Sequence, residues 1–532
     1  MTARRIPGAA SGPSVRFTFD GSEIEGIDGE PLAVSLLAAG RPILSRSFRF
    51  HRARGLMCST GQCGWCECEV DGVPSVRSCR VPVRSGLVAR GEHALPTVSR
   101  DLLSLVGVGS RWIPPTFYHH RFLRPRRLRK RYLDVLRWFG GRGRLRVADR
   151  TGMPMPAGRG MRSISTDVLV VGGGRSGLLA AIEAAEGGAR VVLVEAEPEL
   201  GGSWCVEVGP DRPEGTIEGL AARAATAGVE VLTRTAATGW YDGMVAAIGD
   251  DVHLEIRAAT VIAATGSVER VPLVPGADRP GVMAARTVTM LVDRFGVVPG
   301  DRALLVGDGL DLAMAAERLR HGGSTVIGPV PGGALRAIRG RRHVTGAEVE
   351  VDGTRARQRV DLVVFGDRSP NLDLVLAAGA AVERRGDTLV PVLDGEGRST
   401  VPSLRVVGSA AGRSAVGAGQ PAGLGHRHAA GPGSVARDAM VCFCEDVRAG
   451  EVLDQQTAGY ADPELIKRRT GALTGPCQGT YCLQAFACLA AAGADRETVA
   501  LPTARPPLRP VRLGDLIATD PTAALPEAAV DA

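Results

Sequence analysis

The sequence predicts an α/β protein of several domains, on three observations. Aromatic residues make up only 4% of the 532 residues whereas glycine occurs 70 times, which suits tight turns between strands and helices better than an aromatic-rich β-sandwich. A complete βαβ pattern begins at Thr166 and a second begins at Asp301. With 44% apolar residues the chain exceeds what one hydrophobic core usually serves, so we expect two to four domains.

The segment before these units has the pattern of a small α+β domain. Residues 15–40 first alternate apolar and polar side chains, turn at Asp20 and Gly21, resume briefly and then become periodic like a helix. This pattern predicts a hairpin followed by a helix, in a domain that closes near residue 105.

A first cysteine quartet follows this helix. Its members are Cys58, Cys63, Cys66 and Cys79. The first three have the spacing with which the plant-type [2Fe–2S] pattern begins, and Gly61 and Gly64 leave room for backbone N–H groups to face the sulfurs. Zinc also accepts four thiolates and is the chemical alternative. The spacing favours an iron–sulfur ligand set.

The βαβ unit from Thr166 carries a nucleotide fingerprint. Gly172, Gly174 and Gly177 form GxGxxG between an apolar strand and a helix, the arrangement that holds a pyrophosphate at a helix N-terminus. Glu195 ends the next strand, where a carboxylate accepts hydrogen bonds from ribose hydroxyls. Because a carboxylate there disfavours a 2′-phosphate, we predict FAD or NAD in preference to NADP.

Two later turns bear on the same site. Thr265 and Gly266 resemble the ATG turn that returns to the nucleotide in two-dinucleotide flavoproteins, which supports FAD. The strand before Gly408 resembles the late flavoprotein strand that usually ends in Gly-Asp, but Ser409 follows the glycine here. A serine hydroxyl can hydrogen-bond the pyrophosphate or the ribityl chain, although without a charge-assisted bond.

The second βαβ unit departs from the fingerprint. Gly307 and Gly309 are present, but Leu312 stands where the third glycine is expected, and the following strand ends without an acid. This half either binds a nucleotide in a modified way or retains only the fold, and both possibilities stay open.

A second cysteine quartet lies near the C-terminal end. Its members are Cys442, Cys444, Cys477 and Cys482. Zinc is a stronger alternative here because the spacing is less diagnostic. The two quartets flank the nucleotide fingerprint in the sequence, which predicts an electron-transfer chain with the nucleotide cofactor in the middle. We expect the other cysteines, Cys68, Cys205 and Cys488, to be small buried hydrophobes.

Charge is concentrated in one segment. Eleven Arg or Lys residues and one acid lie in residues 120–146, against a net charge of +7 for the whole chain. No nucleic-acid reading motif accompanies this segment, so we do not expect nucleic acid as a partner. No stretch approaches the roughly 20 apolar residues of a membrane span, and the first residues lack the apolar stretch of a secretory signal. We therefore expect a cytoplasmic protein whose clustered cysteines bind metal.

The chain as a whole resembles the α subunits of heteromeric amine and amino-acid dehydrogenases, a family that includes sarcosine oxidase, D-hydroxyproline dehydrogenase, opine oxidase and hydrogen cyanide synthase. The resemblance rests on the stretches SFRFHRARGLMC, PPTFYHHRF, DVLVVGGGRSGL, ATGSVERVPLVPGADRPGVM, VCFCEDV, TGPCQGTYC and RPPLRPVRLGDLIA, and on ELGG, which adds Gly201 and Gly202 to the predicted cofactor-binding residues. We expect this chain to lack the aminomethyltransferase-like domain of the sarcosine oxidase α subunit.

The resemblance implies a division into four parts. These are a [2Fe–2S] ferredoxin-like domain at 1–105, a basic helical connector at 106–163, a two-dinucleotide FAD/NAD domain at 164–436 with an inner unit at about 285–375, and at 437–532 a [2Fe–2S] domain similar to bacterioferritin-associated ferredoxin (BFD-like) with a proline-rich tail.

The resemblance also implies a function. A separate flavin-containing β subunit of the amine-oxidase type would oxidise the C–N bond of a small amino acid or secondary amine, an FMN can lie at the subunit interface, and this chain would transfer electrons. Two alternatives remain: a stand-alone NAD(P)H-dependent flavin and iron–sulfur reductase, and a non-catalytic scaffold. No residue is nominated as a catalytic acid or base, in keeping with substrate oxidation on another subunit.

Overall fold

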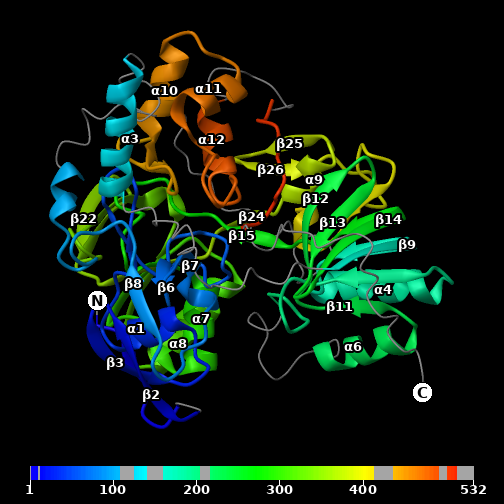
Figure 1. Cartoon of the computed structure of the whole chain (residues 1–532), viewed down its shortest axis with the longest axis horizontal. Helices are drawn as coiled ribbons and strands as arrows, with labels where there is room; N and C mark the ends of the chain where they lie inside the picture. Colours follow the sequence, from blue (N-terminus) through cyan, green and yellow to red (C-terminus); the bar gives the residue numbers. More distant parts are fainter. Residues whose placement is uncertain are drawn as a thin grey trace.

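Two sheets of the nucleotide-binding type form the centre of the molecule (Figure 1). This computed structural model describes residues 2–9, 12–107, 125–140, 160–203, 216–412, 435–490 and 500–511. The first sheet lies at the right of Figure 1, the second sheet lies at the left beside the N-terminal domain, and the C-terminal helices lie on top. The predicted α/β fold class is confirmed.

The N-terminal domain is a five-stranded sheet with one helix on it. Its strand order is β3-β2-β8-β6-β7, and the central β2–β8 pair is parallel. The elements are β2 (Ser14–Phe19), β3 (Ser22–Ile27), α1 (Leu32–Ala38), β4 (Ser45–Arg46), β5 (Ala53–Arg54), β6 (Glu67–Val70), β7 (Val73–Arg77), η1 (Ser78–Arg80), β8 (Val88–Gly91) and η2 (Leu102–Gly107). Strand β2 alternates because Phe17 and Phe19 face the core, and six of the seven residues of α1 are buried.

The first central sheet is built around two long parallel strands. These are β9 (Gly160–Val171) and β14 (Val252–Ala263), which pair along almost their whole length. The sheet continues with β10 (Val191–Val194), β11 (Glu230–Leu232), β12 (Ala236–Tyr241), β13 (Met244–Ile248) and β27 (Leu404–Val406), and its helices are α4 (Arg175–Glu186) and α6 (Ile217–Thr226). Strand β10 is buried at every position, as expected for a parallel strand covered on both faces.

The second central sheet is four-stranded and parallel, in the order β16-β23-β18-β19. Its elements are β16 (Val282–Ala284), α7 (Ala285–Phe295), β17 (Val297–Val298), β18 (Arg302–Val306), α8 (Leu310–His321), β19 (Thr325–Val330), η4 (Gly332–Ala334) and β23 (Leu362–Phe365), with an antiparallel extension of β20 (Leu335–Arg339), β21 (Gly346–Val351) and β22 (Thr354–Gln358). A two-stranded ribbon, β15 (Ser267–Glu269) with β24 (Arg368–Pro370), connects it to the first sheet. This pairing shows that the unit of the second sheet is inserted into the chain of the first, which resumes after it.

The chain then returns to the first sheet and ends in a helical segment. The return contains α9 (Asp373–Ala377), β25 (Val382–Arg385), β26 (Thr388–Pro391) and η5 (Gly408–Ala411). The C-terminal elements are β28 (Met440–Cys442), β29 (Val447–Arg448), α10 (Ala449–Thr457), α11 (Pro463–Thr470) and α12 (Leu483–Ala490). Helix α11 has well-defined ends, because Asp462 accepts a hydrogen bond from the Leu465 N–H at its start and Gly471 adopts a left-handed conformation at its end.

Hydrophobic clusters that are shared between domains hold those domains in place relative to one another. The N-terminal sheet and the second central sheet share one hydrophobic cluster, which contains Phe17 and Leu36 from the first and Met283 and Leu305 from the second. Strand β1 (Arg4–Arg5) also pairs with β17. The division of the chain at residues 105, 163 and 436 stays a prediction, whereas the shared cluster and this strand pair join the N-terminal segment to the second central sheet.

A buried network of charges joins three segments that are far apart in the sequence. Arg54, from β5, donates to Asp278 at 2.5 Å and to Asp446 at 2.7 Å, and all three side chains are at most 3% exposed. Arg49 pairs with Glu451 in the same region. Although burial opposes the charge of each group, the two carboxylates raise the pKa of Arg54, and the nearby arginines lower the pKa of Asp278 to about 2.

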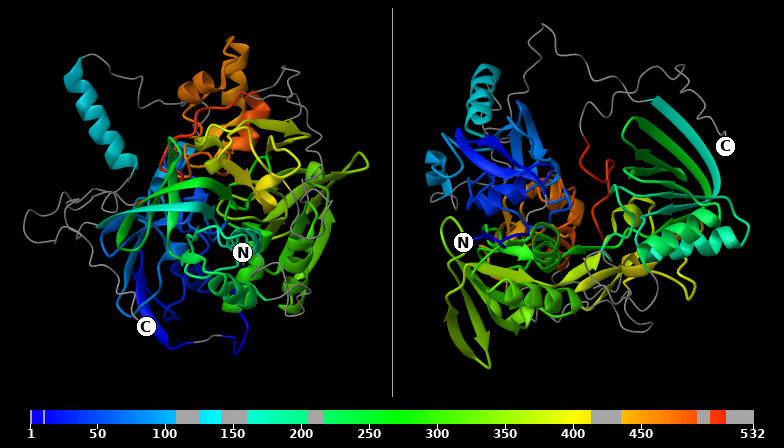
Figure 2. Two further views of the ribbon diagram at one scale, coloured as in Figure 1. Left: turned by 90° about the vertical axis from the view of Figure 1, so that its right-hand side faces the viewer. Right: turned by 90° about the horizontal axis from the view of Figure 1, so that it is seen from below.

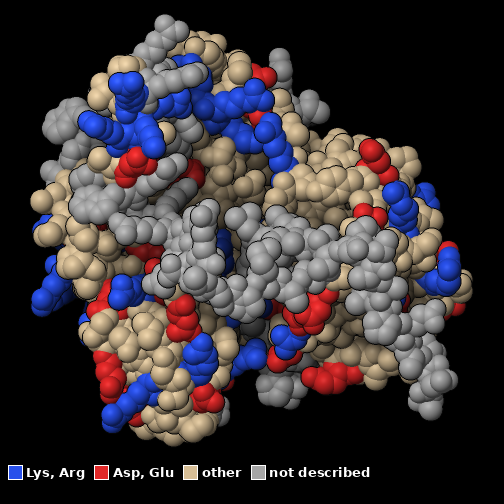
Figure 3. Space-filling model, viewed as in Figure 1, with Lys and Arg blue, Asp and Glu red and all other residues tan. Residues whose placement is uncertain are grey.

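The basic segment forms a helix in its described part. Helix α3 (Arg126–Gly140) stands away from the body in the left view of Figure 2, and Lys and Arg side chains gather over it and over the C-terminal helices in Figure 3. Of the connector predicted at 106–163, residues 106–107 belong to η2 and residues 160–163 to β9, whereas residues 108–124 and 141–159 lie outside the described residues, as do Cys205 and the stretch PPTFYHHRF. In the part of the chain that the structure describes, no helix combines the length and apolar character needed to cross a bilayer.

We expect Arg54→Ala to destabilise the protein by about 3–5 kcal/mol, because the buried Asp446 loses its ion-pair partner and Asp278 retains only Arg52. Thermal unfolding of the full chain should show a lower Tm, and limited proteolysis should release the C-terminal segment sooner. Arg190→Ala, which breaks a largely exposed ion pair with Asp167, is the matched control and should leave Tm unchanged. Equal Tm values for both variants would contradict the importance of the buried network.

Candidate functional site

A cavity of about 770 Å³ lies between the first central sheet and the N-terminal domain. Nine of the ten residues predicted to bind the nucleotide cofactor line it. They are Gly172, Gly174, Glu195, Gly201, Gly202, Thr265, Gly266, Gly408 and Ser409. The tenth, Gly177, lies behind the turn. The structure thus brings together residues from five separate stretches of sequence in a space of the size that cofactor sites have.

The glycine turn between β9 and α4 fits a pyrophosphate. Gly172 has a φ of +112°, which only glycine adopts freely, and a Cβ at Gly177 would lie 1.9 Å from the Gly172 carbonyl oxygen. A Cβ at Gly174 would meet its nearest atom only at 3.8 Å, so this position is open. These are the three roles of the fingerprint: the turn, the close approach of the ligand and the packing of helix on strand.

Glu195 lies at the expected end of β10 and already binds the turn. One carboxylate oxygen accepts the Gly173 N–H at 2.6 Å and the other accepts the Glu197 N–H at 2.7 Å. Burial raises the pKa of this carboxyl, and the two N–H donors oppose that shift. Because each carboxylate oxygen has two acceptor sites, the side chain retains capacity for ribose hydroxyls.

The four thiols of the first quartet are buried. Burial opposes ionisation of Cys58, but its neighbours Cys63, Thr60 and Tyr481 outweigh burial and lower the pKa of the Cys58 thiol to about 6. The pKa of Cys66 is also lowered, mainly by Cys79, whereas the pKa values of Cys63 and Cys79 are raised well above the ordinary value. Two of the four thiols therefore favour the thiolate, the form that ligates metal.

The second quartet is held by two loops that approach closely. Cys477 raises the pKa of Cys444, and Cys442 together with Cys477 raises the pKa of Cys482, in both cases well above the ordinary value. A Cβ at Gly475 would lie 2.3 Å from the Cβ of Cys444, so only glycine allows this approach. Hydrogen bonds lower the pKa of Cys477 well below its ordinary value, the largest effects being those of Cys444 and Cys482.

The spacing of the sulfurs bears on the choice between zinc and iron. Among the described residues, only Glu67, Glu92 and His93 form a group of three or more ligand atoms that all lie within 4.8 Å of one another. No three cysteine sulfurs in the described ranges do so, whereas a tetrahedral zinc with bonds of about 2.3 Å would hold all four thiolates at about 3.8 Å. The sulfurs are therefore spread more widely than one tetrahedral zinc would hold them, an arrangement that suits the larger [2Fe–2S] unit.

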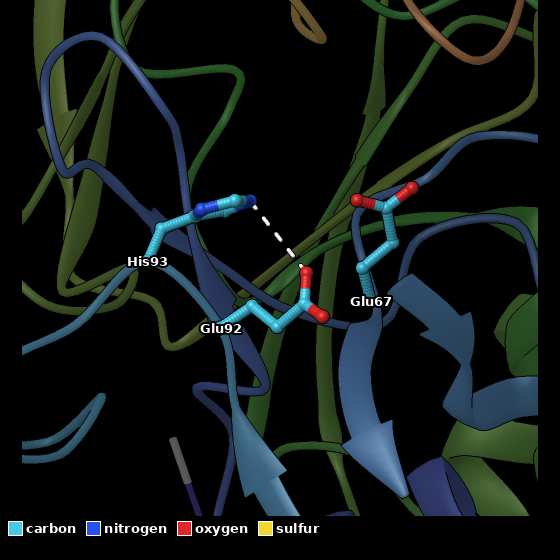
Figure 4. Close-up of side chains that lie close together, drawn as sticks. All are labelled: Glu67, Glu92 and His93. Carbon is cyan, nitrogen blue, oxygen red and sulfur yellow. Dashed lines mark ion pairs between the residues drawn. The ribbon is translucent and has the colours of Figure 1, made fainter. Parts of the chain in front are cut away.

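Glu67, Glu92 and His93 are better explained as a buried polar network (Figure 4). Glu67 pairs with Arg77 at 3.2 Å, Glu92 accepts the Ser75 N–H, and His93 lies 3.7 Å from Glu92. A guanidinium already supplies positive charge to this group. We assign no metal to it.

The two quartets lie side by side, which corrects the arrangement expected from the sequence. The Cys63 carbonyl oxygen is 3.9 Å from the Cys444 sulfur, and the Trp65 and Phe443 rings pack with centroids 4.9 Å apart. The cavity borders only the first quartet, through Cys58 and Cys79. The order in space is therefore cavity, first quartet, second quartet, and the cofactor site is at one end because the C-terminal segment folds back onto the N-terminal domain.

Several residues of the cavity wall were not found from the sequence. Tyr481 lies inside the second cysteine loop, and Glu269 forms a largely buried ion pair with Arg286 at 2.5 Å. Asp373 accepts the Thr480 hydroxyl at 3.0 Å, and burial raises the pKa of its carboxyl to about 7. Tyr481 could have been found from the sequence, because it lies between two cysteines of the second quartet. Glu269, Arg286 and Asp373 are brought to the cavity by tertiary contacts alone.

The remaining cysteine predictions can be compared with the structure. Cys68 is fully buried and donates to the Leu44 carbonyl, and burial raises its pKa well above the ordinary value, so it is an inert thiol. Cys488 is only partly buried, contrary to expectation, because α12 presents it to the Asp387 carbonyl near the surface.

The second nucleotide half-site is modified by its own side chains. Leu312 is buried in the core, and the Asp367 carboxylate lies 2.5 Å from where a Cβ of Gly307 would be. Asp311, in the first turn of α8, pairs with Arg368 at 3.0 Å. Carboxylates thus occupy the helix N-terminus where a pyrophosphate would need free N–H donors.

We expect Gly177→Ala to abolish flavin retention, since the added methyl would collide with the Gly172 carbonyl oxygen and displace α4 from β9. The measurement is the flavin-to-protein ratio after purification. Gly395→Ala adds a methyl with no atom within 4 Å and is the control. Wild-type flavin content in Gly177→Ala would contradict the assignment of the turn.

A second prediction concerns Asp373. Its folded-state pKa of about 7 lies above the unfolded value of about 4, so the folded state binds the proton more tightly. The resulting stabilisation is complete below about pH 4 and is lost as the pH rises to about 7. Relative to Asp373→Asn, the wild type should therefore lose Tm across this window. A constant difference in Tm between the two proteins would contradict the raised pKa.

Comparison with known proteins identifies three regions of the chain. Residues 12–94 match the family described as a 2Fe-2S iron-sulfur cluster binding domain, residues 167–276 match the FAD dependent oxidoreductases, and residues 436–520 match the sarcosine oxidase A3 domain. The fold resembles that of L-proline dehydrogenase from P. horikoshii with a TM-score of 0.68 and 21% identity, covering 95% of this chain and 98% of that one.

Two curated relatives extend the comparison. The alpha subunit of sarcosine oxidase from Rhizobium meliloti is 33% identical over 321 residues, which are 53% of this chain and 31% of the relative. The A subunit of opine oxidase from Agrobacterium tumefaciens is 26% identical over 462 residues, covering 66% of this chain and 91% of the relative. The chain thus spans about a third of the first relative and most of the second. Over these lengths the chain is similar to the α subunits of sarcosine oxidase and to the A subunits of opine oxidase.

Proposed function

We propose that this chain is the electron-transferring subunit of a heteromeric flavin-dependent dehydrogenase or oxidase that acts on the C–N bond of a small amino acid or secondary amine. The substrate class, of the sarcosine, hydroxyproline, opine or glycine kind, is proposed from the names of the relatives. The single observation that supports the relay is the unbroken spatial series of cavity, first quartet and second quartet.

The proposed ligand sets follow from this geometry. Cys58, Cys63, Cys66 and Cys79 would hold one [2Fe–2S] cluster, and Cys442, Cys444, Cys477 and Cys482 would hold another. The Gly172–Gly177 turn and Glu195 would hold FAD, with NAD as the alternative at the same place. When bound, a flavin exchanges two electrons and each cluster exchanges one, chemistry that side chains alone do not supply.

The protein's own residues position and shield these groups. The α4 N-terminus and its glycine turn offer backbone N–H donors to a pyrophosphate, and Ser409 offers a hydroxyl. Trp65 and Phe443 fill the space between the quartets and exclude water, which strengthens the hydrogen bonds to the sulfurs. All the described cysteines are free thiols, in keeping with the proposed cytoplasmic placement.

The partner is proposed to be a flavin-containing β subunit of the amine-oxidase type, with an FMN at the interface as a further proposed cofactor. The relatives are named as subunits, which supports a heteromeric assembly. The rival function, an NAD(P)H-dependent reductase, is disfavoured by the carboxylates at the second half-site. Rapid bleaching of the isolated chain's flavin by NADH would favour that rival, and retention of neither flavin nor nucleotide by the reconstituted chain would favour a scaffold.

We expect anaerobically purified chain to contain about two irons for each quartet and no zinc. Cys63→Ser and Cys444→Ser should each remove one cluster, with the loss read by iron and sulfide analysis and by the EPR spectrum of the reduced protein. Because the quartets adjoin, the spectrum of the fully reduced wild type should show magnetic interaction between two clusters. Cys68→Ala is the control and should retain full iron content.

Co-purification with the β-type subunit tests the function itself. The complex should oxidise a small amine or amino acid, whereas the isolated chain should not. Full amine oxidation by the isolated chain would contradict the relay, and zinc at the C-terminal quartet would contradict the second cluster.

A further inference from the structure

One residue of the C-terminal segment reaches both the first quartet and the cavity. Tyr481 directly precedes Cys482 of the second quartet. Its hydroxyl lies 3.2 Å from the Thr60 hydroxyl, which lies beside Cys58 of the first quartet. Tyr481 is 8% exposed and its ring forms part of the cavity wall.

Thr60 completes this arrangement from the N-terminal side. Its backbone N–H lies 3.4 Å from the Cys58 sulfur and its hydroxyl lies 3.3 Å from the same atom. Because the Thr60 hydroxyl donates its one proton to Cys58, the Tyr481 hydroxyl donates to Thr60. The two hydroxyl dipoles therefore form a chain that points toward one sulfur.

The electrostatic consequence concerns the first cluster. A hydrogen bond to a cluster sulfur stabilises the reduced state more than the oxidised state, because the reduced state has more negative charge. We propose that Tyr481, from within the loop of the second quartet, sets the reduction potential of the cluster held by the first. This inference rests on the proposed function, and it makes Tyr481 a positioning residue whose contribution depends on the two segments being docked.

Tyr481→Phe is the sharpest test, since it removes the hydroxyl and keeps the ring and the backbone N–H. The measurement is an EPR-monitored redox titration of the full chain in complex with its β-type subunit. We expect the first cluster to move to a more negative potential while the second keeps its own. Tyr460→Phe is the matched control, because Tyr460 lies in the same C-terminal segment and packs against Arg469; both potentials should then stay unchanged.

Thr60 provides the second variant. Thr60→Val should also move the first cluster to a more negative potential, and Thr60→Ser, which retains a hydroxyl, should restore it. This pair decides the question if Tyr481→Phe fails to assemble. Unchanged potentials in iron-loaded Tyr481→Phe and Thr60→Val would overturn the inference alone, whereas iron-free wild type would overturn the proposed function and the inference with it. A shift of both clusters in Tyr481→Phe would also overturn it, since the hydroxyl that is removed contacts Thr60, beside the first cluster.

Discussion

Arg54 lies where three parts of the chain meet, and its guanidinium binds Asp278 from the central body and Asp446 from the C-terminal segment. All three groups are almost fully removed from water. Charges buried in this way are costly unless each has its partner, so the network tolerates only one relative placement of the three segments. The positions of the cysteine quartets depend on that placement.

The quartets are adjacent because the C-terminal segment is docked at this network. Asp446 directly follows the loop that carries Cys442 and Cys444, and Arg54 precedes the loop of the first quartet by a few residues. The Arg54 guanidinium also lies 5.6 Å from the centre of the Trp65 ring, which packs against Phe443 between the two quartets. The interface that contains the buried charge pairs of Arg54 therefore also places the two quartets next to each other.

The cavity places the first quartet next to the glycine turn of the first central sheet. Its wall combines the glycine turn of the first sheet with Cys58 and Tyr481 from opposite ends of the chain. The second sheet repeats the strand–turn–helix unit in a smaller sheet of different strand order, and Asp367 and Asp311 lie near the start of its helix α8. A repeated unit of this kind does not by itself provide a second equivalent nucleotide site.

The sequence by itself determined the local structure and the ligand types. The alternation of β2, the glycines at 172, 174 and 177 and the spacing of the first cysteines are short-range patterns, so they could be predicted residue by residue. Only the tertiary structure decided which sites are neighbours. The order of the sites along the chain places the nucleotide site between the quartets. In the folded protein the buried pairing of Arg54 brings the two ends together, and contacts such as Tyr481 to Thr60 join residues more than 400 positions apart. Such contacts depend on burial and charge pairing between segments, which no local pattern records.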